Sequence, residues 1–126
     1  MINSMFLRMH LSGEVMNLSN KQKLLVVKGV EKYKEIRQYI PEMIPFYPIG
    51  LPKFNGEWQC AGYRNAEKLF LIVWRMDSEQ DEIKIPIKVD KANIIYGLAD
   101  IGICSIFENN LSVKIREKYN ALIIEC

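Results

Sequence analysis

Apolar residues recur with a helical period in the first third of the chain. Ser19 and Gln22 form a capping-box pattern, in which the serine hydroxyl accepts from the backbone amide three residues on and the glutamine side chain reaches back. From there apolar positions follow one another at steps of three or four, which places them on one helical face. The pattern predicts a helix over 20–39, ended by Pro41, with an apolar stripe consisting of Val26, Val30, Tyr33, Ile36 and Ile40.

The segments on either side of this helix are apolar without a helical period. Residues 5–11 form a short apolar run closed by Ser12 and Gly13, and this pattern predicts a buried strand. Residues 39–54 contain four prolines, which exclude a regular helix there because each fixes φ and removes a donor. The same segment carries many large apolar side chains, whereas a flexible linker would be polar and rich in glycine or serine.

After the proline-rich segment the period changes to two. Residues 56–65 and 68–76 are joined by a polar tip, which predicts a β-hairpin. The second of these strands is apolar at nearly every position, so we expect both of its faces to be covered. Residues 83–88 then alternate cleanly, with isoleucines inward, and Pro86 favours an edge strand because it cannot donate to a ladder.

Four more short strands are expected towards the C-terminus, over 93–98, 104–107, 111–115 and 121–125, with Glu108-Asn109-Asn110 as a turn. Short strands separated by polar turns are typical of an antiparallel sandwich or barrel, and a helix followed by strands is also the order of an α+β chain. We therefore predict a mainly β protein, an antiparallel β-sandwich preceded by one long helix. The expected division is 1–40 for the first segment, 41–54 for the junction and 55–126 for the sandwich.

Composition and charge narrow the class of protein further. The 126 residues include 49% hydrophobic and 25% charged side chains, a globular balance that excludes disorder. The net charge of +2, without a basic run interleaved with aromatics, argues against nucleic acid and membrane surfaces as partners. The N-terminus lacks a signal-peptide pattern and no run is long enough to span a membrane, so we expect a cytoplasmic protein.

The sequence offers few residues for catalysis. Cys60, Cys104 and Cys126 are far apart and lack a Cys-x-x-Cys pair, so we interpret them as free thiols in a reducing compartment. His10 is the only histidine, which leaves little basis for a metal site or a histidine-based triad. No nucleotide-binding motif occurs, and the acidic residues of 77–82 are expected to form a solvated loop. We predict no cofactor, no metal and no catalytic residue.

Aromatic residues of the predicted hairpin suggest a second possibility, a stacking platform for a sugar ring. Aromatics in strands are more often core, because each buries about 150–250 Å². Trp74 lies inside an apolar strand and is expected in the core. Trp58, between Glu57 and Gln59, is the better candidate for exposure, and we consider it together with Tyr63 as a sugar-stacking pair.

Two stretches resemble the C-terminal part of α-galactosidase-like glycoside hydrolases, the family 36 group. In 8–37 the resemblance rests on Leu11-Ser12-Gly13, on Leu18-Ser19 and on the Tyr-Lys-x-x-Arg ending of 33–37. In 44–76 it rests on the Pro-Phe-x-Pro-x-Gly-Leu-Pro run and the closing Val-Trp-Arg. The resemblance implies that the first segment is the last βα unit of a (β/α)₈ barrel and that the remainder is the C-terminal β-sandwich.

This resemblance also suggests a role. The catalytic aspartates of that family lie on earlier barrel strands, and no motif here matches them, so the implied role is to stabilise a barrel that this chain lacks. The turn after the last barrel strand, His10, Ser12, Gly13 and Glu14, would border the substrate in a full-length relative; alternatively it is a structural turn that needs Gly13. The apolar junction would lie between barrel and sandwich, or else pack on its own sheet.

The expected partners follow from these alternatives. A missing barrel domain or a second copy would cover the junction and the helix stripe, and α-galactosides would bind if the chain is part of a complete enzyme. The helix could also fold back over its own sandwich and give a monomer. A carbohydrate-binding module and a self-associating scaffold remain the alternative functions.

Overall fold

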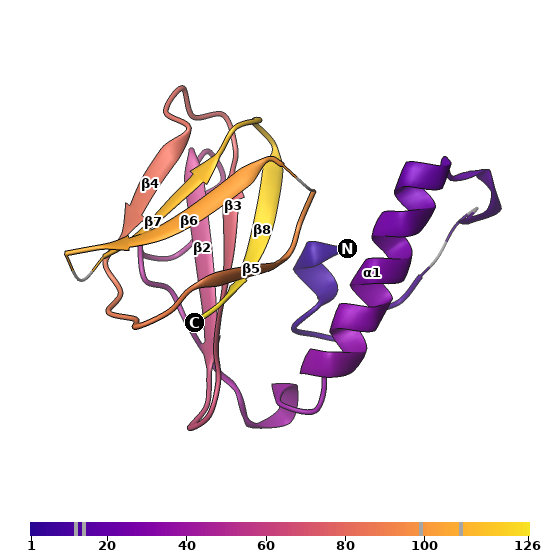
Figure 1. Cartoon of the computed structure of the whole chain (residues 1–126), viewed down its shortest axis with the longest axis horizontal. Helices are drawn as coiled ribbons and strands as arrows, with labels where there is room; N and C mark the ends of the chain where they lie inside the picture. The colour runs from indigo at the N-terminus through magenta and orange to yellow at the C-terminus, as the bar shows by residue number, and fades with distance from the viewer. Residues whose placement is uncertain (12, 14, 99, 109) are drawn as a thin grey trace.

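The computed structural model describes residues 1–11, 13, 15–98, 100–108 and 110–126, and within these residues eight strands form two antiparallel sheets (Figure 1). The first sheet has the order β1-β2-β3-β8-β5 and the second the order β4-β7-β6. The strands are β1 Ile44–Phe46, β2 Trp58–Arg64, β3 Leu69–Arg75, β4 Glu82–Ile85, β5 Asn93–Tyr96, β6 Gly102–Phe107, β7 Asn110–Ile115 and β8 Asn120–Glu125. The predicted fold class, a β-sandwich preceded by a helix, is confirmed.

Strand β3 is the centre of the molecule because both of its faces are buried. Leu71 and Val73 point into the core between the two sheets, where they pack with Ile85, Leu111, Leu122 and other aliphatic side chains. Phe70 and Ile72 point to the opposite face and pack under the N-terminal segments. The prediction that this strand is covered on both sides is confirmed, and so is the hairpin, since β2 and β3 pair in continuous register.

The second sheet also agrees with the sequence pattern. Strand β4 lies at an edge, pairs only with β7 among the described strands, and ends just before Pro86. Ile85 is fully buried, and Ile83 and Ile87 pack against the same core. The β6–β7 turn falls at the expected position, although Asn109 lies outside the described residues.

Helix α1 (Asn20–Ile36) covers the outer face of the first sheet (Figure 1). The predicted capping box is present, with Ser19 and Gln22 each bonding the other's backbone amide. The helix ends before the predicted residue 39, and a short 3-10 helix over Ile40–Glu42 follows. Of the apolar stripe, Ile36 is buried, and Tyr33 and Ile40 pack against the cluster under the helix. The helix thus folds onto its own sheet.

Gly29 explains how closely α1 approaches the sheet. A β-carbon at this position would lie 2.1 Å from the Met1 side chain and 2.9 Å from the Tyr96 hydroxyl. That hydroxyl donates to the Leu25 carbonyl of the helix (3.0 Å), so strand β5 is tied directly to the helix backbone. Only glycine leaves room for this contact.

The strand expected over 5–11 is not formed. Residues Ile2–Ser4 make a 3-10 helix, and the apolar run that follows passes between α1 and the first sheet without a strand partner. Met5 and Phe6 are nonetheless buried, and the Phe6 ring stacks on Tyr63 at 4.5 Å and tilts against Phe70 at 5.4 Å. The run is apolar because it fills the space under the helix, which needs burial but no ladder.

The proline-rich junction is half anchored and half exposed. β1 adds a third strand to the β2–β3 hairpin, and the Phe46 ring packs against Gly62, where a β-carbon would be 2.3 Å from it. Phe46 and Ile49 pack against the core between the sheets. By contrast, Ile44, Leu51 and Phe54 are 65%, 73% and 101% exposed. Packing of the junction on its own sheet therefore explains the apolar character of only part of this segment.

Candidate functional site

A cleft of about 690 Å³ opens at the end of the sandwich where β2 begins and the β3–β4 loop turns back. Trp58, at the start of β2, and Ile83 of β4 form its apolar part. Glu57, Ser78, Gln80 and Asp81 are among the polar residues that line it. Loop side chains held at one end of a rigid sandwich are a common arrangement for binding.

Trp58 is half buried in this cleft. Its register partner is Arg75 at the end of β3, and its indole packs against the core between the sheets. The indole N–H is enclosed and has no hydrogen-bond partner among the described residues. Trp58 is therefore less exposed than expected, and it presents only part of its ring to the cleft.

Arg75 fixes the loop that forms the cleft wall. Its guanidinium donates to the backbone carbonyls of Ser78 (2.8 and 3.2 Å), Ile115 (2.8 Å) and Arg116 (2.7 Å). The side chain is buried, and these bonds connect β3 of one sheet to the end of β7 in the other. Our sequence analysis missed this role; the only signal was a cation directly after an uninterrupted apolar strand.

Ser78 and Glu57 extend this network to the surface of the cleft. The Ser78 hydroxyl donates to the Glu57 carboxylate (3.1 Å) and accepts from the backbone N–H of Gln80 (3.2 Å). Ser78 is 1% exposed, so it was wrong to treat all of 77–82 as a solvated loop. A fixed loop presents its remaining polar groups at defined positions, which favours selective binding.

Lysine partners favour the ionised form of Asp81 in the cleft and of Asp77 beside it. A hydrogen bond from Lys114 lowers the pKa of Asp81, and a hydrogen bond from Lys118 lowers the pKa of the neighbouring Asp77. Lys118 also pairs with Glu79. Ionised carboxylates accept hydrogen bonds from hydroxyl groups but do not donate protons at neutral pH. The arrangement is suited to holding a polar ligand rather than to general acid catalysis.

Trp58 and Tyr63 do not form a shared platform. Side chains five positions apart on one strand point to opposite faces of the sheet, and Trp58 packs towards the core between the sheets while Tyr63 faces the cluster under the helix. One face of the Tyr63 ring is covered by Phe6. Burial, followed by the nearby Tyr47, raises the pKa of Tyr63. Trp74 lies with Tyr63 on the helix side, where its N–H donates to Asn3 (3.0 Å).

The turn suggested as a substrate border lies apart from this cleft. His10 is exposed, and Gly13 has a φ of +95°, which requires glycine whatever the function of the turn. Neither residue lines the cleft at Trp58. Ser12 and Glu14 lie outside the described residues.

The cysteines are free and are gathered in the core. Cys60 is buried, and Cys104 and Cys126 pack against the same cluster. Burial, followed by the nearby Cys126, raises the pKa of Cys60 to about 12, and burial raises that of Cys126 to about 11. These thiols are protonated at neutral pH, which makes them poor nucleophiles and poor metal ligands. Within the described ranges, no group of three or more histidine, cysteine or acidic side chains could hold a metal ion.

Comparisons with known proteins give no match for this chain: no family model, no curated protein and no solved structure. In the part of the chain that the structure describes, no helix has the length and apolar character needed to cross a membrane.

Proposed function

We propose that this chain is a non-catalytic β-sandwich domain of a cytoplasmic glycoside hydrolase resembling the α-galactosidases, and that it stabilises the catalytic barrel. The observation that carries this proposal is the exposed half of the proline-rich junction, in which Ile44, Leu51 and Phe54 are exposed on a segment anchored by Phe46 and Ile49. Exposed apolar side chains held on a rigid segment are typical of an interface between domains. The motif resemblance supports the identity of the partner.

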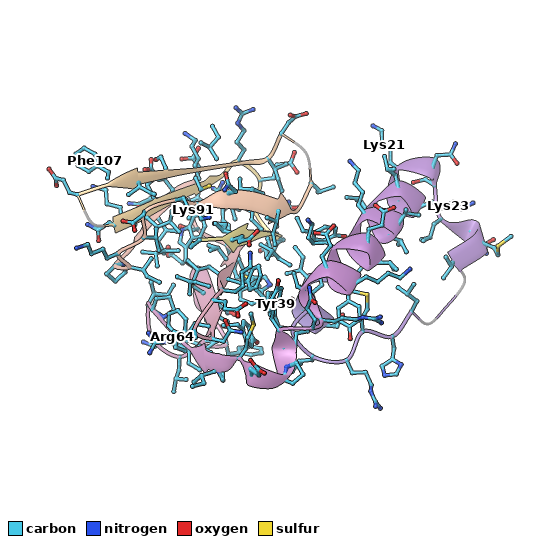
Figure 2. The ribbon with its side chains drawn as sticks, turned by 60° about the horizontal axis from the view of Figure 1, so that its bottom comes forward. Lys21, Lys23, Tyr39, Arg64, Lys91 and Phe107 are labelled. Atoms are coloured by element: carbon cyan, nitrogen blue, oxygen red, sulfur yellow. The ribbon has the colours of Figure 1, made fainter. Side chains whose placement is uncertain are left out.

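The anchoring makes this segment suitable for docking. Phe46 is fixed over Gly62, and the Arg64 guanidinium lies over its ring at 5.1 Å. Prolines restrict the remaining backbone, so little conformational entropy is lost when the segment is covered. Figure 2 shows Arg64 near the bottom of the view and Phe107 at its upper left, at the opposite side of the strands.

A binding experiment tests the docking role. The chain is added to the barrel of an α-galactosidase prepared without its own sandwich, and the melting temperature of the barrel is followed. We expect the wild-type chain to raise it and the double variant Leu51→Ser, Phe54→Ser to have no effect. Ile103→Ser, which also removes an exposed apolar side chain but lies outside the junction, is the matched control and should behave as the wild type.

Two results would contradict this proposal. One is a barrel whose melting temperature is unchanged by the wild-type chain at a hundredfold excess. The other is turnover of an aryl α-galactoside by the purified chain that disappears when one of its carboxylates is replaced, because the chain would then be catalytic by itself.

The cleft at Trp58 favours a second candidate function, carbohydrate binding. It combines part of an aromatic ring with the Asp81 carboxylate and the side-chain amide of Gln80, on a loop fixed by Arg75. Ligand sites usually join an apolar wall to a few well-placed polar groups. Tyr63, which the sequence analysis paired with Trp58, is not part of this proposed sugar-binding site.

The two tryptophans of the chain allow a direct test. Trp74→Phe leaves Trp58 as the only indole, so its fluorescence reports on the cleft alone. Titration with methyl α-galactoside should give a saturable change that is lost in Gln80→Ala, whereas Gln38→Ala, which lies just after α1 and does not line the cleft, should have no effect. If the indole fluorescence stays constant up to about 100 mM sugar, any dissociation constant is far above the millimolar range. That result would exclude this function.

A further inference from the structure

The four edge strands of the two sheets differ in how they are protected. An edge strand exposes unpaired N–H and C=O groups, and proteins normally shield such edges with charges, prolines, short length or a covering element. β1 has three residues and contains Pro45. β4 carries Glu82 and Lys84 and is followed by Pro86. β5 is approached by α1, whose Leu25 carbonyl accepts from Tyr96.

β6 carries neither charge nor proline, and β5 approaches it without forming a ladder with it. Its six residues, Gly102–Phe107, include no charged residue and no proline, and β7 is its one ladder partner among the described strands. Ile103, Ile106 and Phe107 are 53%, 40% and 59% exposed. Figure 2 shows Phe107 at the far tip of the second sheet, well away from the helix, and Figure 1 shows β6 along the side of that sheet.

The two faces of β6 have different surroundings. Cys104 points to the core side, where its thiol donates to the Ala92 carbonyl (3.5 Å). Ile103, Ser105 and Phe107 alternate with it and share the outer face, opposite Lys114, Ser112 and Asn110 of β7. The chain just before β5 therefore packs against the core-side face of β6.

We propose that the β6 edges of two copies of this chain pair antiparallel about a two-fold axis at Ser105, which joins two three-stranded sheets into one of six strands. This register places Ile103 opposite Phe107 of the other copy, Cys104 opposite Ile106, and Ser105 opposite its own counterpart. Aromatic with β-branched and hydroxyl with hydroxyl are favourable cross-strand pairs, and no charges oppose one another. The edge is thus complementary to itself, which is the requirement for a two-fold interface.

The interface is small, so the dimer is expected to be weak. Five paired residues and three apolar side chains bury less than the roughly 1,200 Å² of a standard stable interface, and contacts of that size are transient. Sedimentation velocity should therefore cover about 10 µM to 1 mM and show a concentration-dependent shift from the 14.7 kDa monomer towards the dimer.

A charged substitution at the axis tests the register. Ser105→Lys places two ammonium groups opposite each other, and we expect the dissociation constant to rise about tenfold or more. Ser112→Lys is the matched control, because it adds the same charge to the same outer face one strand inward and should leave the dimer unchanged. The variant Leu51→Ser, Phe54→Ser should also dimerise, since its changes lie in the junction.

Crosslinking gives an independent measurement. Under mild oxidation Ser105→Cys should form an intermolecular disulfide much faster than either Ser112→Cys or the wild-type chain, because only residues near the axis bring their Cα atoms within disulfide distance. A monomer up to 1 mM, a dimer unaffected by Ser105→Lys, or equal crosslinking of the Ser105→Cys and Ser112→Cys variants would each overturn the proposal.

Discussion

The two faces of β3 are covered in different ways. The core between the sheets is almost entirely aliphatic, and Leu71, Val73, Leu111 and Leu122 are fully buried within it. The layer under α1 contains aromatic rings, the irregular N-terminal segment and a tyrosine that bonds to a helix carbonyl. Both layers that enclose the first core are hydrogen-bonded sheets, whereas α1 and the N-terminal segment over the second core belong to no ladder. We infer that the sandwich is the stable unit and that the helix layer opens more easily.

The largest expected effect comes from a cavity between the sheets. Leu122→Ala should lower the free energy of unfolding by about 3–4 kcal/mol, because Leu122 is fully buried and its side chain fills the space left by Gly97 and Gly102. Ile36→Ala in the helix layer should instead speed amide exchange over 20–36 while the strands stay protected. Equal loss of protection in both regions for both variants would show that the two layers unfold together. Urea unfolding and amide exchange give these two measurements.

Substitution of Arg75 tests whether the stability of the sandwich depends on this buried guanidinium. Arg75→Met keeps much of the side-chain volume but leaves the carbonyls of Ser78, Ile115 and Arg116 without their donor. We expect a loss of about 2–3 kcal/mol, since unpaired buried acceptors retain their desolvation cost. Arg116→Met, an exposed arginine next to Ile115, is the control and should change stability by less than about 0.5 kcal/mol. A small effect at Arg75 would mean that water replaces the guanidinium.

Alkaline pH should weaken the core between the sheets specifically. In the folded chain burial holds the Cys60 thiol protonated, with a pKa of about 12 against a usual value of 9.0. Above pH 9 the unfolded chain releases this proton and the folded chain does not, so stability is complete below pH 9 and falls as pH rises towards 12. The expected loss by pH 10 is about 1 kcal/mol. Cys60→Ala should flatten the decline between pH 8 and 10 in thermal melts; an unchanged slope would assign it to other groups.

The smallest expected effect lies at the contact between helix and sheet. Tyr96→Phe removes the hydroxyl that donates to the Leu25 carbonyl and should cost about 1 kcal/mol or less, detected as faster exchange in α1. Tyr33→Phe is a suitable comparison, because that hydroxyl reaches the Leu7 carbonyl at a longer 3.4 Å and should matter less. A drop in global stability from Tyr96→Phe would contradict the separation of the two layers.

The successes and failures of the sequence analysis have a common physical origin. Strand periodicity predicted the β2–β3 hairpin and the burial of both faces of β3, because alternation and continuous apolar runs are local consequences of burial. The run over 5–11 was wrongly expected to be a strand because burial alone does not say whether a ladder partner exists. The Trp58–Tyr63 pair was drawn from residue type, and the odd spacing of five already placed the two rings on opposite faces.

The sequence by itself determined the elements whose causes are local: the capping box at Ser19, the strand alternation, and the turn at Gly13 with its positive φ. Only the tertiary structure decided where Arg75 finds its acceptors, which half of the junction is anchored, and which edge strand is left without protection. These depend on segments that are separate in the sequence and meet through packing, such as Arg75 and Ile115, which are 40 residues apart. Hydrophobic burial has no preferred direction, so it shows which residues are covered but not by what.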